Sequence, residues 1–207
     1  MSLMSRIFAL TYDRSMARME AAGFRELRRR ALAQAAGDVL EIGGGTGSNL
    51  PYYGPAVTSL TISEPEAPML RRLEKKVREQ GSTTRVVRAP AEDLPFPDGS
   101  FDTVVSTLVL CGVADQPRAL REIRRVLRPG GRLVFIEHVR SEDPKLARWQ
   151  DRLNRLNRFV AGCECNRATL ETIRREGFEV ENLETTTLNK VPKFVRPAIV
   201  GAATAVS

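Results

Sequence analysis

The sequence predicts a single α/β domain with a mainly parallel sheet at its centre. Short apolar, β-branched segments alternate with helical segments, which is the pattern of parallel strands joined by right-handed crossovers. A cluster of glycines follows the first strand, and the length of 207 residues suits one core. No internal repeat or linker divides the chain.

Seven segments are expected to be strands, most of them short, apolar or β-branched, and bounded by glycine, proline or polar residues. The first five are expected to be parallel. The last two, joined by a turn near Asn189, are expected to form an antiparallel pair at the end of the sheet. The segments span residues 38–42, 57–62, 84–88, 101–110, 132–138, 180–187 and 194–206.

Helices are expected between these strands, where apolar residues recur at helical spacing. The first is polar and Arg-rich and ends at Gly37, and the third is closed by Pro129-Gly130-Gly131. The expected helices span residues 12–36, 65–80, 116–128, 144–160 and 167–175.

The composition argues against several classes of protein. The net charge is +7, from 32 Lys and Arg against 25 Asp and Glu, but the basic residues are spread over several helices with acids nearby. A nucleic-acid surface is therefore not expected. No run of about 18 apolar residues occurs, so no membrane span is expected. Three cysteines without a visible secretory signal predict a cytoplasmic chain with no disulfide framework.

The glycine loop is the most informative motif, and it reads Glu41-Ile42-Gly43-Gly44-Gly45-Thr46-Gly47. A glycine loop between strand and helix lets a ligand approach the backbone closely. Dinucleotides favour G-x-G-x-x-G, but here the third glycine position is Ser48 or Leu50, depending on the register. The Glu41 carboxylate would repel a diphosphate and suits an ammonium group. S-adenosylmethionine carries an ammonium and a sulfonium and no phosphate.

Two further acidic positions follow the next strands. Glu64 ends the second strand, where a carboxylate can accept hydrogen bonds from both hydroxyls of a ribose. Ala91-Glu92-Asp93 follows the third strand and could bond an adenine amino group. Taken singly, these features also fit a packing turn, a solvated acid at a helix start and a surface charge. Together they follow consecutive strands at one sheet edge, which favours a nucleoside site.

These motifs resemble those of class I S-adenosylmethionine-dependent methyltransferases of the methyltransferase domain 11 type. The resemblance implies a Rossmann-like sheet of order 3-2-1-4-5-7-6, with strand 7 antiparallel and helices on both faces. It implies S-adenosylmethionine as cofactor and S-adenosylhomocysteine as product. The matching strings are residues 39–47, Glu64, residues 91–96, Phe101-Asp102 and residues 127–131.

The resemblance also implies different roles for successive parts of the single domain of residues 1–207. Residues 1–36 would be a helical lid, 37–140 the cofactor-binding core, 141–176 a helical cap on the acceptor side and 177–207 the strand pair. Gly44 replaces the Cys, Ala or Ser more common in such loops. The expected cofactor-binding residues are Glu41, Gly43, Gly44, Gly45, Gly47, Asn49, Glu64, Pro65, Ala91, Glu92, Thr107 and Leu108.

A narrower resemblance concerns the methyl acceptor. Residues 106–113, Glu137-His138-Val139 and Gly162-Cys163 followed by Arg167 are similar to the methyltransferase-like 7 group. That group is associated with methylation of alkyl thiols, and its animal members sit on membranes. The long hydrophobic anchor of that group is not expected in this sequence. The expected acceptor is thus small and lipophilic, with a thiol as one candidate, and peripheral membrane contact stays open.

Several other functions are alternatives to this one. Phospholipid amines and quinone-type acceptors are alternatives within the methyltransferases. A nucleic-acid methyltransferase is disfavoured, because the position after the fourth strand lacks an Asn/Asp-Pro-Pro-Tyr/Phe string. A binding module without catalysis is a further alternative, and an NAD-dependent oxidoreductase is disfavoured by the glycine register.

The remaining candidates lie in the second half of the chain. His138, the only histidine, follows the fifth strand and is either a base or structurally hydrogen-bonded. Cys111, and the pair Cys163 and Cys165, are expected to pack or to line the acceptor side. Their spacing predicts neither a redox pair nor a metal site.

An apolar stripe is expected on the helix of residues 144–160. Its members, Trp149, Leu153, Leu156 and Phe159, are expected individually to pack into the core, or collectively to form an apolar cap. The arginines of the same helix would face solvent or anionic lipid headgroups. They are Arg148, Arg152, Arg155 and Arg158.

Overall fold

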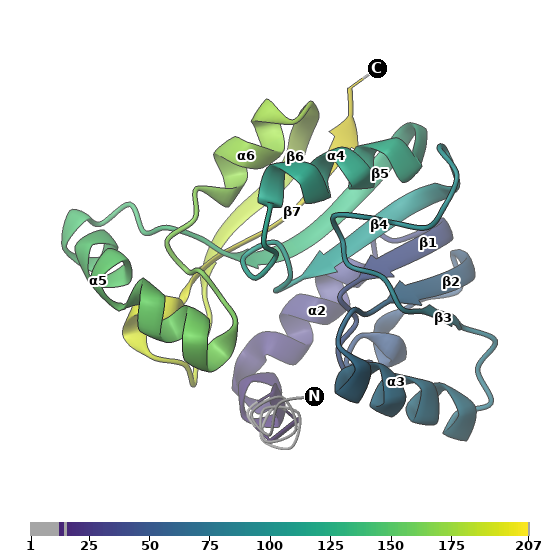
Figure 1. The fold of residues 1–207 in the computed structure, drawn as a ribbon, viewed down its shortest axis with the longest axis horizontal. Coiled ribbons are helices and arrows are strands. Elements are labelled where there is room, and N and C mark those ends of the chain that lie inside the picture. Colours follow the sequence, from purple (N-terminus) through teal and green to yellow (C-terminus); the bar gives the residue numbers. More distant parts are fainter. Residues whose placement is uncertain (1–12, 15, 207) are drawn as a thin grey trace.

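A computed structural model describes residues 13–14 and 16–206 of the chain (Figure 1). Its seven strands form one sheet in the order β3-β2-β1-β4-β5-β7-β6. β7 is antiparallel to both β5 and β6, and the other pairs are parallel. The predicted order and the antiparallel strand are therefore confirmed. The strands are β1 (Gly37–Ile42), β2 (Val57–Ser63), β3 (Arg85–Val87), β4 (Phe101–Thr107), β5 (Leu127–His138), β6 (Phe178–Thr187) and β7 (Pro197–Ala205).

Alternating side chains of the central strands fill two separate apolar layers. Leu40 and Val104 belong to the layer under α4 and α6, whereas Val39 and Val105 belong to the layer under α2. Figure 1 shows α2 and α3 on one side of the sheet and α4 and α6 on the other. The helical segments are η1 (Glu20–Phe24), α2 (Arg25–Leu32), η2 (Leu50–Tyr52), α3 (Ala67–Glu79), α4 (Gln116–Val126), α5 (Pro144–Ala161), α6 (Thr169–Arg175) and η3 (Lys193–Val195).

The N-terminal helical region is kinked, where the sequence predicts one continuous helix. Ala22 and Gly23 leave helical geometry, and Gly23 has a φ of 113°. Glycine adopts this conformation without steric cost, so it marks the kink. Phe24 and Leu27 then turn into the layer beneath α2.

The junction of α4 and β5 also differs from the prediction. The helix ends at Val126 rather than Arg128, because Leu127 already has extended backbone and pairs with Phe101. The Pro129-Gly130-Gly131 segment lies inside β5, where the pairing register shifts. A segment expected to close the helix is therefore an irregularity within a long strand.

Helix α5 contradicts the expectation that its apolar stripe packs into the core. Its buried residues include Gln150 and Asn157, while Trp149, Leu156 and Phe159 are 61%, 61% and 75% exposed. The polar side chains face the protein because they bond to backbone carbonyls there. Gln150 Nε2 lies 2.8 Å from the oxygen of Cys165, and Asn157 Nδ2 lies 2.6 Å from the oxygen of Cys163.

Among the residues that the structure describes, none of the helices combines the length and the apolar character needed to cross a membrane.

Candidate active site

The glycine loop leaves the carboxyl end of β1 in a conformation that glycine favours. Gly43, Gly45 and Gly47 have φ values of 57°, 57° and 76°. A Cβ at Gly43 would come within 2.7 Å of Val109, and one at Gly44 within 2.2 Å of Ile62. Close packing therefore also requires these glycines, and the loop's shape follows from the protein's own contacts.

Glu41 lies beside this loop and is buried. Its carboxylate accepts hydrogen bonds from Asn49 Nδ2 at 3.0 Å and from the Tyr53 hydroxyl at 2.6 Å. Burial raises the pKa of Glu41 to about 7, against the opposing effects of Tyr53, Arg28 and Asn49. A positively charged ligand beside Glu41 would therefore favour the ionised form of this carboxyl group at neutral pH.

Asn49 joins three parts of the site. It donates to Glu41 and to Thr107 Oγ1, the latter at 3.1 Å, and its oxygen accepts from the buried Arg28. Leu108 follows Thr107 with a φ of 58°, a left-handed conformation that residues with a side chain seldom adopt. The predicted residues after β1 and β4 thus meet at one point of the sheet edge.

Glu64 reaches the same loop from β2. Its carboxylate accepts from the N–H groups of Gly45 and Glu66, both at 2.8 Å. Burial raises the pKa of Glu64, and the two backbone donors partly offset that effect. Each carboxylate oxygen has a second lone pair, so the group can still receive ribose hydroxyls.

The predicted residues next to β2 and β3 have other contacts. The Pro65 carbonyl accepts from Arg88, and Ala91 is buried. Glu92 Oε1 accepts from the N–H groups of Ala114 at 2.7 Å and Asp115 at 3.3 Å. Glu92 therefore tethers the start of α4 to the loop after β3, and its role toward adenine stays a prediction.

The N-terminal helix touches the glycine loop directly. Thr46 Oγ1 donates to Asp13 at 2.7 Å, and Arg72 forms an ion pair with Asp13 at 2.9 Å. Tyr12 lies outside the described residues. From the sequence, it is expected to pack the N-terminal helix against the sheet or, as the less favoured alternative, to cover the methionine part of a cofactor.

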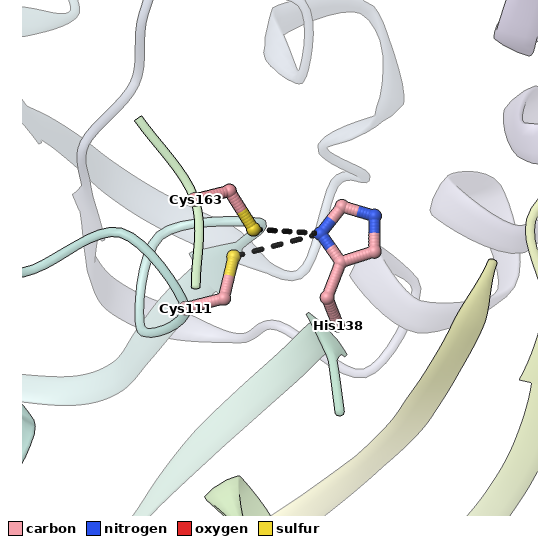
Figure 2. Close-up of side chains that lie close together, drawn as sticks. All are labelled: Cys111, His138 and Cys163. Atoms are coloured by element: carbon pink, nitrogen blue, oxygen red, sulfur yellow. Dashed lines mark hydrogen bonds between the residues drawn. The ribbon is translucent and has the colours of Figure 1, made fainter. Parts of the chain in front are cut away.

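His138 is buried at the end of β5, where two thiols approach one of its nitrogens. Nδ1 lies 3.6 Å from Cys111 Sγ and 3.4 Å from Cys163 Sγ, and both sulfurs face it in Figure 2. Within the described part of the chain, Nε2 has no hydrogen-bond partner. The hydrogen bond to Cys163, together with burial, raises the pKa of the Cys111 thiol well above its usual value. The role of His138 as a base stays a prediction.

Comparison with known proteins fits this geometry. The profile of the methyltransferase domain matches residues 40–135, which contain the glycine loop and the strand ends. The human protein named thiol S-methyltransferase TMT1A is 34% identical over 201 residues, covering 95% of this chain and 82% of its own length.

The chain belongs to the class I S-adenosylmethionine-dependent methyltransferases. Its cofactor is S-adenosylmethionine.

Other relatives of this methyltransferase match a shorter part of it. The ubiquinone/menaquinone biosynthesis C-methyltransferase UbiE of Hahella chejuensis is 37% identical over 57% of this chain and 49% of its own. The phosphatidylethanolamine N-methyltransferase of Cereibacter sphaeroides is 38% identical over 58% of this chain and 61% of its own.

Solved structures agree on the fold. An S-adenosylmethionine-dependent methyltransferase from Thermotoga maritima superimposes with a TM-score of 0.72 at 24% identity, covering 99% of this chain and 100% of its own. An N-methyltransferase from Bradyrhizobium japonicum, solved with S-adenosylhomocysteine, gives 0.68 at 19% identity, covering 91% of this chain and 88% of its own.

Sequence reasoning missed several side chains around the methyltransferase site. Arg28 and Tyr53 contact Asn49 and Glu41, but no local pattern distinguishes them from other Arg and Tyr residues. Glu137 accepts four hydrogen bonds, from the Ser106 hydroxyl and the N–H groups of residues 109–111. A carboxylate inside an apolar strand, adjacent to His138, was the available signal for Glu137.

Proposed function

We propose that this methyltransferase transfers the methyl group of S-adenosylmethionine to a small lipophilic thiol. The observation that carries the proposal is the extent of similarity. The match to TMT1A covers 95% of the chain, including the cap and the C-terminal strands, whereas the quinone and phospholipid relatives match 57% and 58%. The acceptor side is the part that distinguishes methyltransferases sharing one cofactor core.

The cofactor would lie along the carboxyl ends of β1, β2 and β4. Glu41 would face its ammonium group, the backbone of residues 43–47 its methionine part, and Glu64 its ribose hydroxyls. Asn49 and Thr107 hold Glu41 and the end of β4 together at that edge. Ala91 and Glu92 would border the adenine, and Pro65 and Leu108 would also contact the cofactor.

Methyl transfer to a thiol is an in-line displacement, and the enzyme's contribution is mainly position. The thiolate sulfur attacks the methyl carbon, and the bond from that carbon to the sulfonium sulfur breaks, leaving a neutral thioether. A free thiol has a pKa near ~8.5, so part of it is already ionised at neutral pH. Charge cancels as thiolate and sulfonium react, so a dry, apolar site favours the step.

The exposed face of α5 supports a lipophilic acceptor and a lipid partner. Trp149, Leu156, Phe159 and Val160 are exposed on this helix, and the arginines at 148, 152, 155 and 158 are exposed as well. Apolar side chains flanked by basic ones match an anionic membrane surface. We propose a peripheral contact of this kind, while no nucleic-acid partner is proposed.

A methyl-transfer assay with matched acceptors tests the proposed reaction. Isotopically labelled S-adenosylmethionine would be offered with an alkyl thiol, an alcohol and an amine of equal chain length, and separately with phosphatidylethanolamine vesicles and a quinol. We expect label on the thiol, and its suppression by added S-adenosylhomocysteine. Preferential labelling of the lipid amine or the quinol would contradict the thiol proposal and leave the methyltransferase assignment intact.

A further inference from the structure

Three of the chain's four His and Cys side chains converge on one buried point. The sequence holds one histidine and three cysteines. The Nδ1 of His138 and the sulfurs of Cys111 and Cys163 lie within 4.8 Å of one another, and all three residues are buried (Figure 2). They come from three segments: the end of β5, the turn after β4 and the segment between α5 and α6.

The two nitrogen–sulfur separations in this group match those between ligands of one tetrahedral metal ion. Zinc–sulfur bonds of about 2.3 Å and zinc–nitrogen bonds of about 2.0–2.1 Å place neighbouring sulfur and nitrogen ligands about 3.6 Å apart. The two nitrogen–sulfur distances here are 3.6 and 3.4 Å. These two distances are thus those expected of ligands on one ion, and no two of the three atoms lie more than 4.8 Å apart.

The backbone around Cys111 is held by bonds independent of its thiol. Glu137 accepts from the N–H of Cys111 at 3.1 Å, and the Cys111 carbonyl accepts from the N–H of Glu164 at 2.8 Å. The carbonyl of Cys163 accepts from Asn157 at 2.6 Å.

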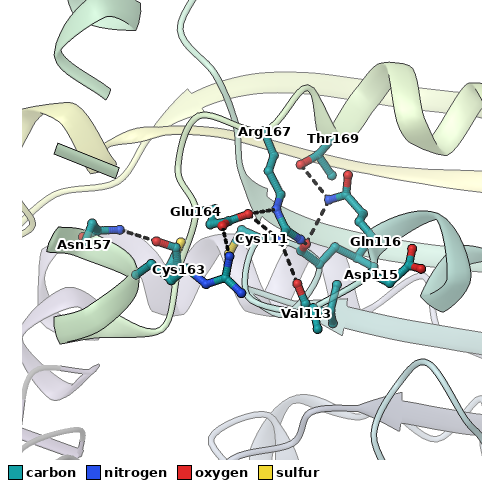
Figure 3. Close-up of polar contacts among 12 residues, drawn as sticks. Cys111, Val113, Asp115, Gln116, Asn157, Cys163, Glu164, Arg167 and Thr169 are labelled. Carbon is teal, nitrogen blue, oxygen red and sulfur yellow. Dashed lines mark hydrogen bonds and ion pairs between the residues drawn. The ribbon is translucent and has the colours of Figure 1, made fainter. Parts of the chain in front are cut away.

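Arg167 fixes the two cysteine segments to each other. It donates to the carbonyls of Leu110 at 2.9 Å and Val113 at 2.7 Å, and it pairs with Glu164 (Figure 3). The ligand-bearing segments are thus positioned before any ion binds, as supporting bonds do in metal sites.

Charge selects the kind of ion. Two thiolates and a neutral imidazole carry a charge of −2, which a divalent cation cancels, so the complex adds no net charge to the interior. Thiolate and imidazole are soft to borderline donors, which favour zinc over magnesium or calcium.

We propose that Cys111, Cys163 and His138 bind a soft divalent metal ion, best matched by Zn²⁺. Its fourth position is left to a non-protein ligand, and the ion clips the segment after α5 onto the core.

Metal content and cobalt spectroscopy test the site without an activity assay. The full chain would be purified without a histidine tag, and zinc would be measured per chain by mass spectrometry. We expect about one equivalent, and we expect Co²⁺ added to the zinc-free chain to give thiolate-to-cobalt charge-transfer absorption. Cys163→Ser and His138→Ala should each weaken Co²⁺ binding more than about 100-fold, since loss of outer contacts alone costs 10–100-fold.

Cys165→Ser is the matched control. Cys165 is also a buried cysteine without a disulfide, but it does not belong to the group formed by Cys111, His138 and Cys163. It should keep full metal content and the cobalt spectrum. Circular dichroism of each variant separates lost binding from lost folding. Wild-type chain that takes up neither zinc nor cobalt, or that is isolated with a Cys111–Cys163 disulfide, would overturn the proposal. Unchanged cobalt binding by folded Cys163→Ser would overturn it as well.

Discussion

Glu41 shows how burial and a few partners set the chemistry of a single residue. Glu41 is 3% exposed, and its carboxylate accepts hydrogen bonds from Asn49 and Tyr53. Arg28 and Glu64 are the charged groups that affect its pKa. Because its pKa is raised to about 7, this carboxyl changes its protonation state near neutral pH. The ammonium group of the cofactor would favour the ionised form of Glu41, so cofactor binding should release a proton from this carboxyl group.

We therefore expect the affinity for S-adenosylhomocysteine to increase as the pH rises through 7. At pH 6 the carboxyl is mostly protonated, and binding should be about tenfold weaker than on the plateau above the pKa, since one pKa unit is worth about 1.4 kcal/mol. Calorimetric titration in a series of buffers measures this change and the released proton. Glu41→Gln should bind weakly with no such pH dependence, and an identical profile in both proteins would refute the role of Glu41.

Glu64 offers a second test at this scale. Glu64→Gln keeps the shape of the side chain but removes its charge, and we expect it to weaken cofactor binding by about 1–3 kcal/mol through lost charged hydrogen bonds. Glu66→Gln, exposed two residues later, should leave the dissociation constant unchanged. If Glu64→Gln binds as tightly as the wild type, the ribose site is elsewhere.

Helix α5 attaches to the body of the molecule through polar side chains, and Gln150 is central to that attachment. Its Nε2 is close to the carbonyls of Val139, Cys165 and Phe194, and its oxygen accepts from the N–H of Ser141 at 2.8 Å. One fully buried amide therefore ties the helix to three other segments.

Gln150→Leu should destabilise the protein by about 2–4 kcal/mol, because it leaves several buried backbone groups without partners. Urea denaturation followed by circular dichroism measures the free energy of unfolding. Gln80→Leu, exposed at the end of α3, should change it by less than about 0.5 kcal/mol. Equal stability of the Gln150→Leu variant and the wild type would show that these bonds do not hold α5.

The outer face of α5 makes a separate prediction about membranes. Trp149 is the only tryptophan, so its fluorescence reports directly on this face. We expect anionic vesicles to shift its emission to shorter wavelength, and raised salt to weaken the effect. Phe159→Ser should reduce vesicle binding, whereas Leu183→Ser, an exposed apolar residue on β6, should not. Binding that is equal for neutral and anionic vesicles would count against the arginine contribution.

At the scale of the whole molecule, the strands could be predicted because local apolar segments mark them, whereas their order was predicted only through the family resemblance that the glycine loop and the other motifs carry. The orientation of α5 could not, since periodicity shows that a helix has two faces but not which face meets the protein. Hydrophobicity alone predicts that each residue of the α5 stripe packs into the core or that together they form an apolar cap. The carbonyls that attract Gln150 and Asn157 come from distant segments.

The residues of the site also fall into two groups, those whose meeting the sequence predicts and those whose meeting it does not. Glu41, Glu64 and the loop glycines lie at the carboxyl ends of β1 and β2, so their meeting follows from the parallel pairing of these two strands. The meeting of His138 with Cys111 and Cys163 depends on how the segment after α5 folds back, which no local pattern records.

The most direct test of the account is calorimetric titration of the chain with S-adenosylhomocysteine and, separately, with NAD⁺. A carboxylate-flanked glycine loop without a G-x-G-x-x-G register should bind the first with a micromolar dissociation constant and the second not measurably. Tight binding of NAD⁺ with no binding of S-adenosylhomocysteine would contradict it.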